Sequence, residues 1–99
     1  MSDTFRMALR IGAAHPALAG HFPGHPVVPG VVVLERVAAA LRAWRGERLV
    51  KLDAKFVQPL LPDDEAVIEL QAEAARIRFT VTRADGVALA RGTLRSAQT

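Results

Sequence analysis

The sequence predicts an α+β fold in which one helix packs against an antiparallel sheet of about five strands. Two observations lead to this prediction. Apolar residues recur at helical spacing in one segment, residues 30–45, whereas the segments on either side alternate between apolar and polar residues. The chain has 99 residues, a length that suits one domain, so we expect a single domain over residues 1–99.

The first predicted strand covers residues 4–11, because its apolar residues alternate and share one face: Phe5, Met7, Leu9 and Ile11. Residues 12–29 have a different composition. Glycine and proline are dense there, and the 3 histidines of the chain all fall in this stretch: His15, His21 and His25. Such a segment predicts an ordered loop, and a loop of this length in a small domain is usually functional.

The predicted helix runs from Gly30 to Arg45, after Pro29, which suits a first helical turn, and before Gly46, which suits a helix end. Its predicted apolar stripe is Val31, Leu34, Val37, Ala38 and Leu41. The first half is apolar nearly all round, and Glu35 is its first charged residue. We therefore expect this half of the helix to be buried on more than one side.

Four strands are predicted after the helix, at residues 49–58, 65–75, 77–82 and 87–94. The first of them has one apolar face, made of Val50, Leu52, Ala54 and Phe56. Asp85 and Gly86 predict a tight hairpin before the last strand. Residues 70–77 also suit a helix by composition, but the alternation that runs into them favours a long strand.

Composition excludes several classes of protein. The chain has no cysteine, which rules out a disulfide scaffold, a cysteine zinc site and a thiol nucleophile. It has no long apolar run and no secretory signal pattern, so we expect a cytoplasmic protein without a membrane span. Its net charge is +3, but the basic residues are dispersed and aromatic residues make up 5%, so we expect no nucleic-acid partner.

The most specific segment is residues 21–35, which read HFPGHPVVPGVVVLE. This segment resembles the signature of the hotdog-fold 3-hydroxyacyl-acyl-carrier-protein dehydratases of the FabA/FabZ type. That signature is HFPG, any residue, Pro, two apolar residues, PG, four residues and then an acid, and every fixed position is met. Residues 54–59, AKFVQP, and the Pro62-Asp63-Asp64 step are also similar to the family. The compact form is similar to small dehydratase-like proteins of aryl polyene pathways.

The resemblance implies a hotdog fold, in which a curved antiparallel sheet wraps a central helix. It also implies a homodimer or higher oligomer, with active sites at the subunit interface and without metal or cofactor. His21 matches the catalytic histidine and Glu35 the catalytic acid, which comes from the other subunit. Gly30 matches the glycine whose N–H binds the thioester carbonyl. We expect Phe22 and Pro29 beside the substrate as well, although Phe22 also suits the core.

The chemistry of dehydration suits these residue types. A neutral imidazole is an effective base near pH 7 for the proton next to the thioester carbonyl. Hydroxide leaves poorly, so Glu35 would have to be protonated to assist, and the apolar residues 31–34 predict surroundings that favour that form. The substrate would arrive on an acyl carrier protein, and dispersed basic residues would attract an acidic carrier. The candidates are Arg36, Arg42, Arg45, Arg48, Lys51 and Lys55, and the sequence does not choose among them.

Other functions remain open from the sequence. A zinc site can be drawn from His15, His21, His25 and Glu35, but the spacing contains no helical pair and the resemblance implies no metal. A hotdog acyl thioesterase would also use an acid or a base. A non-catalytic acyl-binding or assembly subunit is the third alternative, because Ala39 stands where these dehydratases often carry Gln, one helical turn after the acid.

Overall fold

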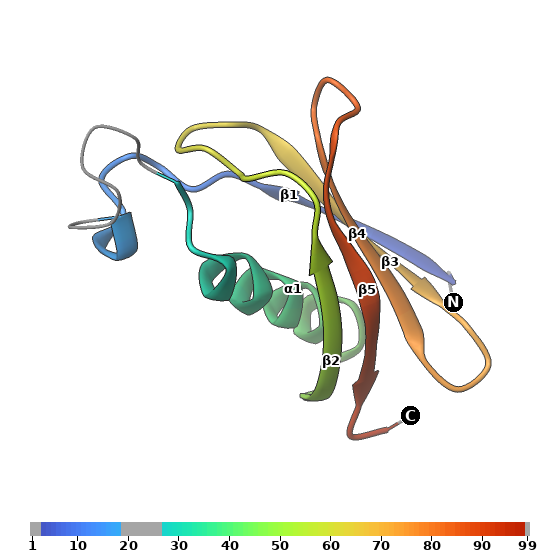
Figure 1. Cartoon of the computed structure of the whole chain (residues 1–99). Helices are drawn as coiled ribbons and strands as arrows, with labels where there is room; N and C mark the ends of the chain where they lie inside the picture. Colours follow the sequence, from blue (N-terminus) through green and yellow to red (C-terminus); the bar gives the residue numbers. More distant parts are fainter. Residues whose placement is uncertain (1–2, 19–26, 99) are drawn as a thin grey trace.

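The protein folds as one helix against a five-stranded antiparallel sheet, as predicted (Figure 1). The computed structural model describes residues 3–18 and 27–98. The elements in chain order are β1 (Thr4–Leu9), the 3-10 turn η1 (Pro16–Leu18), α1 (Gly30–Arg45), β2 (Leu49–Phe56), β3 (Ala66–Ala72), β4 (Ile77–Arg83) and β5 (Ala88–Ser96). The spatial order of the strands is β1-β3-β4-β5-β2, which places β1 and β2 at the two edges.

The helix α1 begins and ends where the sequence predicts. Pro29 precedes it with φ −58° and ψ 142°, and Gly46 ends it in the left-handed conformation at φ 67°, with its N–H donating to the Arg42 carbonyl at 2.8 Å. Within the described ranges, no helix is both long and apolar enough to cross a membrane.

The predicted buried face of α1 is partly wrong. The buried residues are Val32, Val33, Val37, Ala40 and Leu41, whereas Val31 is 61% exposed. The sheet packs on the row formed by Val33, Val37 and Leu41, which are four residues apart and so lie one above another. Val31 lies outside that row, so this chain alone does not enclose the first half of α1 on several sides.

The core lies between α1 and the central strands, and there the predicted alternation is confirmed. Ile68 lies opposite Val81 and Leu70 opposite Phe79, and all four side chains are fully buried. Such cross-strand apolar pairs stabilise the sheet and fix its register. At the far end of α1, the ring of Trp44 stacks on Phe5 of β1 with centroids 6.1 Å apart.

The edge strand β2 is much more exposed than predicted. Its register with β5 shifts between Leu49 and Lys51, so a bulge interrupts the predicted apolar face. Val50 is 55% exposed and Phe56 49% exposed, while Leu52 is partly buried. An edge strand has a neighbour on one side only, and sequence alternation does not reveal whether a strand is central or at an edge.

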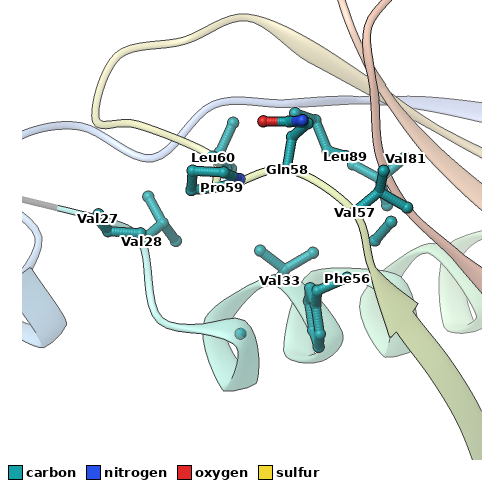
Figure 2. Close-up of a pocket in the computed structure, with 12 residues that line it drawn as sticks. Val27, Val28, Val33, Phe56, Val57, Gln58, Pro59, Leu60, Val81 and Leu89 are labelled. Carbon is teal, nitrogen blue, oxygen red and sulfur yellow. The ribbon is translucent and has the colours of Figure 1, made fainter.

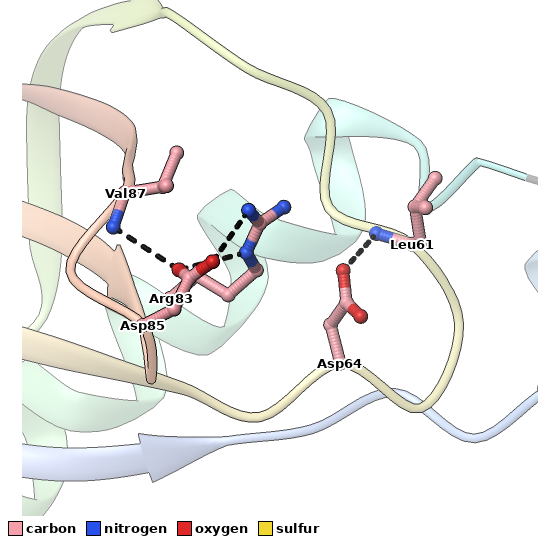
Figure 3. A network of polar contacts seen from close by, with 5 residues as sticks. All are labelled: Leu61, Asp64, Arg83, Asp85 and Val87. Carbon is pink, nitrogen blue, oxygen red and sulfur yellow. Dashed lines mark hydrogen bonds and ion pairs between the residues drawn. The ribbon is translucent and has the colours of Figure 1, made fainter.

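The turns differ from prediction at one hairpin. The strand predicted over residues 65–75 ends at Ala72, and a turn follows in which the Glu73 N–H donates to the Arg76 carbonyl at 2.9 Å. No helix forms over residues 70–77. The predicted turn at Asp85 and Gly86 is confirmed, with Gly86 at φ 93°. Arg83 there donates to both Asp85 carboxylate oxygens at 2.9 and 2.8 Å (Figure 3).

Candidate functional site

An apolar cavity of about 350 Å³ opens between the start of α1 and the end of β2. Its walls come from segments far apart in the sequence, as Figure 2 shows. They are Val27 and Val28 before α1, Gly30 and Val33 of α1, Phe56 to Leu60 at and after the end of β2, Val81 of β4, and Leu89 and Ala90 of β5. Apart from Gln58 the lining side chains are apolar, which suits an aliphatic ligand.

The first turn of α1 borders this cavity. Pro29 precedes the helix and makes no side-chain cap hydrogen bond, and the Val32 N–H donates to the Pro29 carbonyl at 3.0 Å. Gly30 is the first residue of α1 and lines the cavity, so its N–H belongs to the group of amides that intrahelical bonds leave unsatisfied. A helix start is also the positive end of the helix dipole, which favours a ligand oxygen that gains negative charge.

Glu35 lies on the other side of the same helix. It comes two residues after Val33, which corresponds to a rotation of about 200° around the helix axis. Val33 faces the cavity, whereas Glu35 is exposed. The apolar surroundings expected for Glu35 from residues 31–34 are therefore not formed within one chain, because Val32 and Val33 turn into the core.

The other predicted site residues are placed only in part. Pro29 stands before the helix and next to the cavity, and is not among the residues that line it. His21, Phe22 and His25 fall in residues 19–26, outside the described residues. The structure thus brings Gly30 to a cavity and turns Glu35 away from that cavity.

Metal ligands do not gather in the part of the chain that the structure describes. Within residues 3–18 and 27–98, no three His, Cys, Asp or Glu side chains lie close enough together to hold a metal ion. His15 lies in the loop before η1, where its N–H donates to the Gly12 carbonyl at 3.0 Å.

Sequence reasoning missed most of the cavity walls. The sequence places Phe56 on a strand face and in the AKFVQP stretch, and Leu89 and Ala90 in the last strand, and it assigns none of the three to a cavity. The signal available was the AKFVQP stretch at residues 54–59, where a strand ends in a proline turn. Its position against the start of α1 follows from the sheet order, which the sequence does not state.

Known families and proteins resemble this chain over most of its length. The ApeI-like family, described as ApeI dehydratase, matches residues 1–93. The 3-hydroxyacyl-[acyl-carrier-protein] dehydratase FabZ of Cronobacter sakazakii is 34% identical over 88% of this chain, and that of Klebsiella pneumoniae is 32% identical over the same share. The chain spans 64% of the length of both proteins.

Solved structures support the predicted hotdog fold. The dehydratase heterocomplex ApeI:P from Xenorhabdus doucetiae superposes with a TM-score of 0.80 at 18% identity, over 95% of this chain and 87% of that one. The (R)-hydratase from A. caviae superposes with a TM-score of 0.74 at 20% identity, over 92% of this chain and 90% of that one. At these identities the likeness establishes the fold, and the family match over residues 1–93 establishes the relationship. The chain is a hotdog-fold member of the ApeI-like dehydratase family.

Proposed function

We propose that this protein removes water from 3-hydroxyacyl thioesters on an acyl carrier protein and gives trans-2-enoyl thioesters, in fatty-acid or polyene-type lipid synthesis. The family match and the identity to two FabZ dehydratases support this activity. The observation that carries it is an apolar cavity that has the uncapped start of α1, Gly30, in its wall. Such a cavity offers both a channel for an acyl chain and a backbone donor for a thioester oxygen.

Each proposed residue has one chemical role. The Gly30 N–H binds the thioester oxygen and stabilises the negative charge that develops there. The His21 imidazole takes a proton from C2 of the acyl chain. The bond between C3 and its hydroxyl oxygen then breaks, the Glu35 carboxylic acid gives its proton to that oxygen, and water leaves. A double bond forms between C2 and C3, and no cofactor or metal takes part.

Two copies of the chain are needed for this chemistry, because Glu35 points away from the cavity of its own chain. The edge strand β2 offers the place for a second copy. None of the described strands pairs with its outer side, and apolar residues on and near it are exposed: Val31, Val50, Phe56 and Val57. A homodimer formed through these edges would cover that apolar surface and extend the sheet across both subunits. Such dimers would also be the units of any larger oligomer.

The outer face of β2 and β5 suits an acidic carrier. Lys51 lies opposite Arg95 and Lys55 opposite Arg91, and their side chains are exposed. None of the four forms an ion pair with any described residue. Like charges directly opposite each other destabilise a sheet, so these pairs favour an external anionic partner, and the proposed carrier protein supplies one.

The test uses the purified protein with a 3-hydroxyacyl carrier protein and follows the loss of one water by intact mass. We expect the wild-type protein to convert the substrate, and the His21→Ala and Glu35→Gln variants to lose at least 100-fold in rate. Glu65→Gln is the matched control, because Glu65 is an exposed carboxylate before β3 that does not line the cavity. Release of the free acid would indicate a thioesterase, and binding without reaction would indicate a non-catalytic acyl-binding subunit.

A mixing experiment tests the shared site. When inactive His21→Ala and Glu35→Gln subunits are mixed and allowed to exchange, half of the dimers contain one of each. One of the two sites in each mixed dimer then has both intact residues, so about a quarter of the wild-type activity should return. No recovery, with exchange demonstrated by native mass spectrometry, would contradict a site shared between subunits.

A further inference from the structure

Gly30 lies in close contact with the ring of Phe56. A β-carbon added at Gly30 would stand 2.9 Å from Cζ of Phe56, 3.1 Å from Cε2 and 3.4 Å from Cε1. Among the described glycines, Gly46 and Gly86 have a positive φ and Gly30 does not. The backbone conformation at Gly30 therefore does not require a glycine. The ring of Phe56 therefore accounts for the glycine at position 30, since it fills the space where a side chain would begin.

The backbone around Phe56 is held in place from the other side. Phe56 is the last residue of β2 and lies opposite Ala90 of β5. The next residue, Val57, donates its N–H to the Leu89 carbonyl at 2.8 Å, which fixes the end of the strand. Phe56 is nevertheless 49% exposed. The ring thus stands on a fixed backbone, covers Gly30 with one part and leaves the other part open.

Phe56 and Gly30 line the same cavity, so the ring limits the free space immediately beside the Gly30 backbone. If the Gly30 N–H binds the thioester oxygen, carbon C2 of the acyl chain lies one bond beyond the carbonyl carbon and close to that ring. A branch on C2 would need room for one more methyl group there. A carbon at the β-carbon position of Gly30 would meet the tip of the Phe56 ring, so this part of the cavity takes an extra carbon only if the ring moves.

We infer that Phe56 is a specificity-determining residue, which admits straight acyl chains and rejects thioesters that carry a methyl group on C2. This inference rests on the proposed function, because that function places the thioester at Gly30. The rest of the cavity agrees with a straight aliphatic chain: its walls are apolar, and about 350 Å³ is room for on the order of ten groups the size of a water molecule.

The experiment compares straight and 2-methyl substrates on wild-type protein and on Phe56→Ala. We expect the wild-type protein to favour the straight 3-hydroxyacyl carrier protein by at least 10-fold in kcat/KM, the usual effect of one methyl group in a confined apolar site. In Phe56→Ala this preference should fall to about 2-fold, mainly through a lower KM for the branched substrate. Phe56→Leu, which keeps an apolar side chain but no ring, should show an intermediate preference.

Two controls separate this inference from other effects. Val67→Ala removes an exposed apolar side chain of β3 that does not line the cavity, and it should keep the wild-type preference. The oligomeric state of each variant is measured by native mass spectrometry, and only assemblies that match the wild-type protein are compared. An unchanged preference in Phe56→Ala, or a wild-type protein that treats both substrates alike, would overturn the inference.

A binding measurement distinguishes failure of the inference from failure of the proposed function. Hexanoyl-pantetheine and 2-methylhexanoyl-pantetheine lack the 3-hydroxyl group and cannot be dehydrated, so calorimetry reports their affinity alone. A 10-fold preference for the straight analogue that disappears in Phe56→Ala would support the role of Phe56 even if no dehydration occurs. Dehydration without any such preference would leave the proposed function standing and contradict the inference.

Discussion

Gly92 of β5 lies directly against the backbone of β2 at Asp53. A β-carbon on Gly92 would overlap the Asp53 carbonyl oxygen, and it would also stand 2.8 Å from Cε1 of Phe79 and 3.0 Å from the Cα of Ala54. Gly92 pairs with Ala54 in the sheet register. At Gly92 the backbone of the edge strand β2 and the fully buried ring of Phe79 both lie close to β5. A side chain at position 92 would prevent this packing.

The first prediction is that Gly92→Ala strongly destabilises the fold. We expect a loss of about 3 kcal/mol in the free energy of unfolding, because the overlap involves backbone atoms that no rotamer change can move away. Urea denaturation followed by circular dichroism measures this loss. Gly12→Ala is the matched control: the nearest atom to a β-carbon there is 3.9 Å away, and the substitution should change stability little.

The helix could be predicted from the sequence because its signals are local. Pro29 and Gly46 stand at its two ends, and both act through their own backbone conformation. The buried face was harder to predict, because the first half of α1 is apolar nearly all round and offers several possible stripes. Packing against the sheet selects the stripe that contains Val33, and this depends on elements distant in the sequence.

The candidate site could be predicted as a motif and not as a geometry. The signature segment predicts Gly30 and Glu35 as site residues by their spacing, and the helix places the two residues on different sides. The contact between Gly30 and Phe56 depends on where the end of β2 meets the start of α1. The position of the end of β2 depends on the strand order, in which β2 pairs with β5, the last strand in sequence. No local sequence pattern indicates this pairing.

The second prediction is that Asp63→Gly stabilises the protein. Among the described residues other than glycine, Asp63 alone has a positive φ, at 67°. This backbone conformation costs most residues about 1 kcal/mol and costs glycine very little. The substitution also removes the contact between Asp63 and Arg10, at 3.2 Å, but both side chains are more than half exposed and such pairs contribute little. We expect a net gain of about 0.5 kcal/mol in urea denaturation.

Asp63→Ala separates the two contributions. It removes the contact with Arg10 and keeps a β-carbon in the strained conformation, so it should be less stable than the wild-type protein. If Asp63→Gly and Asp63→Ala lost stability to the same extent, the carboxylate contact would outweigh backbone strain and the prediction would be wrong.

The third prediction concerns pH. The Arg83 guanidinium donates to the Asp85 carboxylate and, with the Val87 N–H, holds the pKa of Asp85 below its usual value (Figure 3). The folded protein therefore binds this proton less readily than the unfolded chain does. The resulting stabilisation is complete at neutral pH and is lost as the pH falls below about 4, through the lowered pKa of the folded state.

Asp85→Asn measures this contribution. We expect the variant to unfold at a lower urea concentration than the wild-type protein at pH 7, and the difference between the two midpoints to shrink as the pH falls below about 4. Asp53→Asn is a suitable control, because Asp53 is an exposed carboxylate that forms no ion pair with a described residue. A difference between Asp85→Asn and wild type that is independent of pH would assign the effect to turn geometry instead of charge.

The fourth prediction separates stability from partner binding on the outer face of β2 and β5. Lys55 lies opposite Arg91, so Lys55→Glu replaces a like-charge pair by an opposite-charge pair. The free energy of unfolding should rise by about 0.2 to 1 kcal/mol, and less at high salt. If the carrier protein docks on this face, the same variant should raise KM for the carrier-bound substrate several-fold and leave kcat unchanged.

The reciprocal variants complete the argument. Arg91→Glu should have the same two effects as Lys55→Glu, because either reversal pairs opposite charges. The double variant Lys55→Glu/Arg91→Glu restores a like-charge pair, so its stability should return close to the wild-type value while KM for the carrier rises further. In the single variants stability rises while affinity for the carrier falls. In the double variant stability returns to the wild-type value while affinity for the carrier falls further. A carrier KM that stays constant across all three would mean that the carrier binds elsewhere, even if the stability changes follow the expected signs.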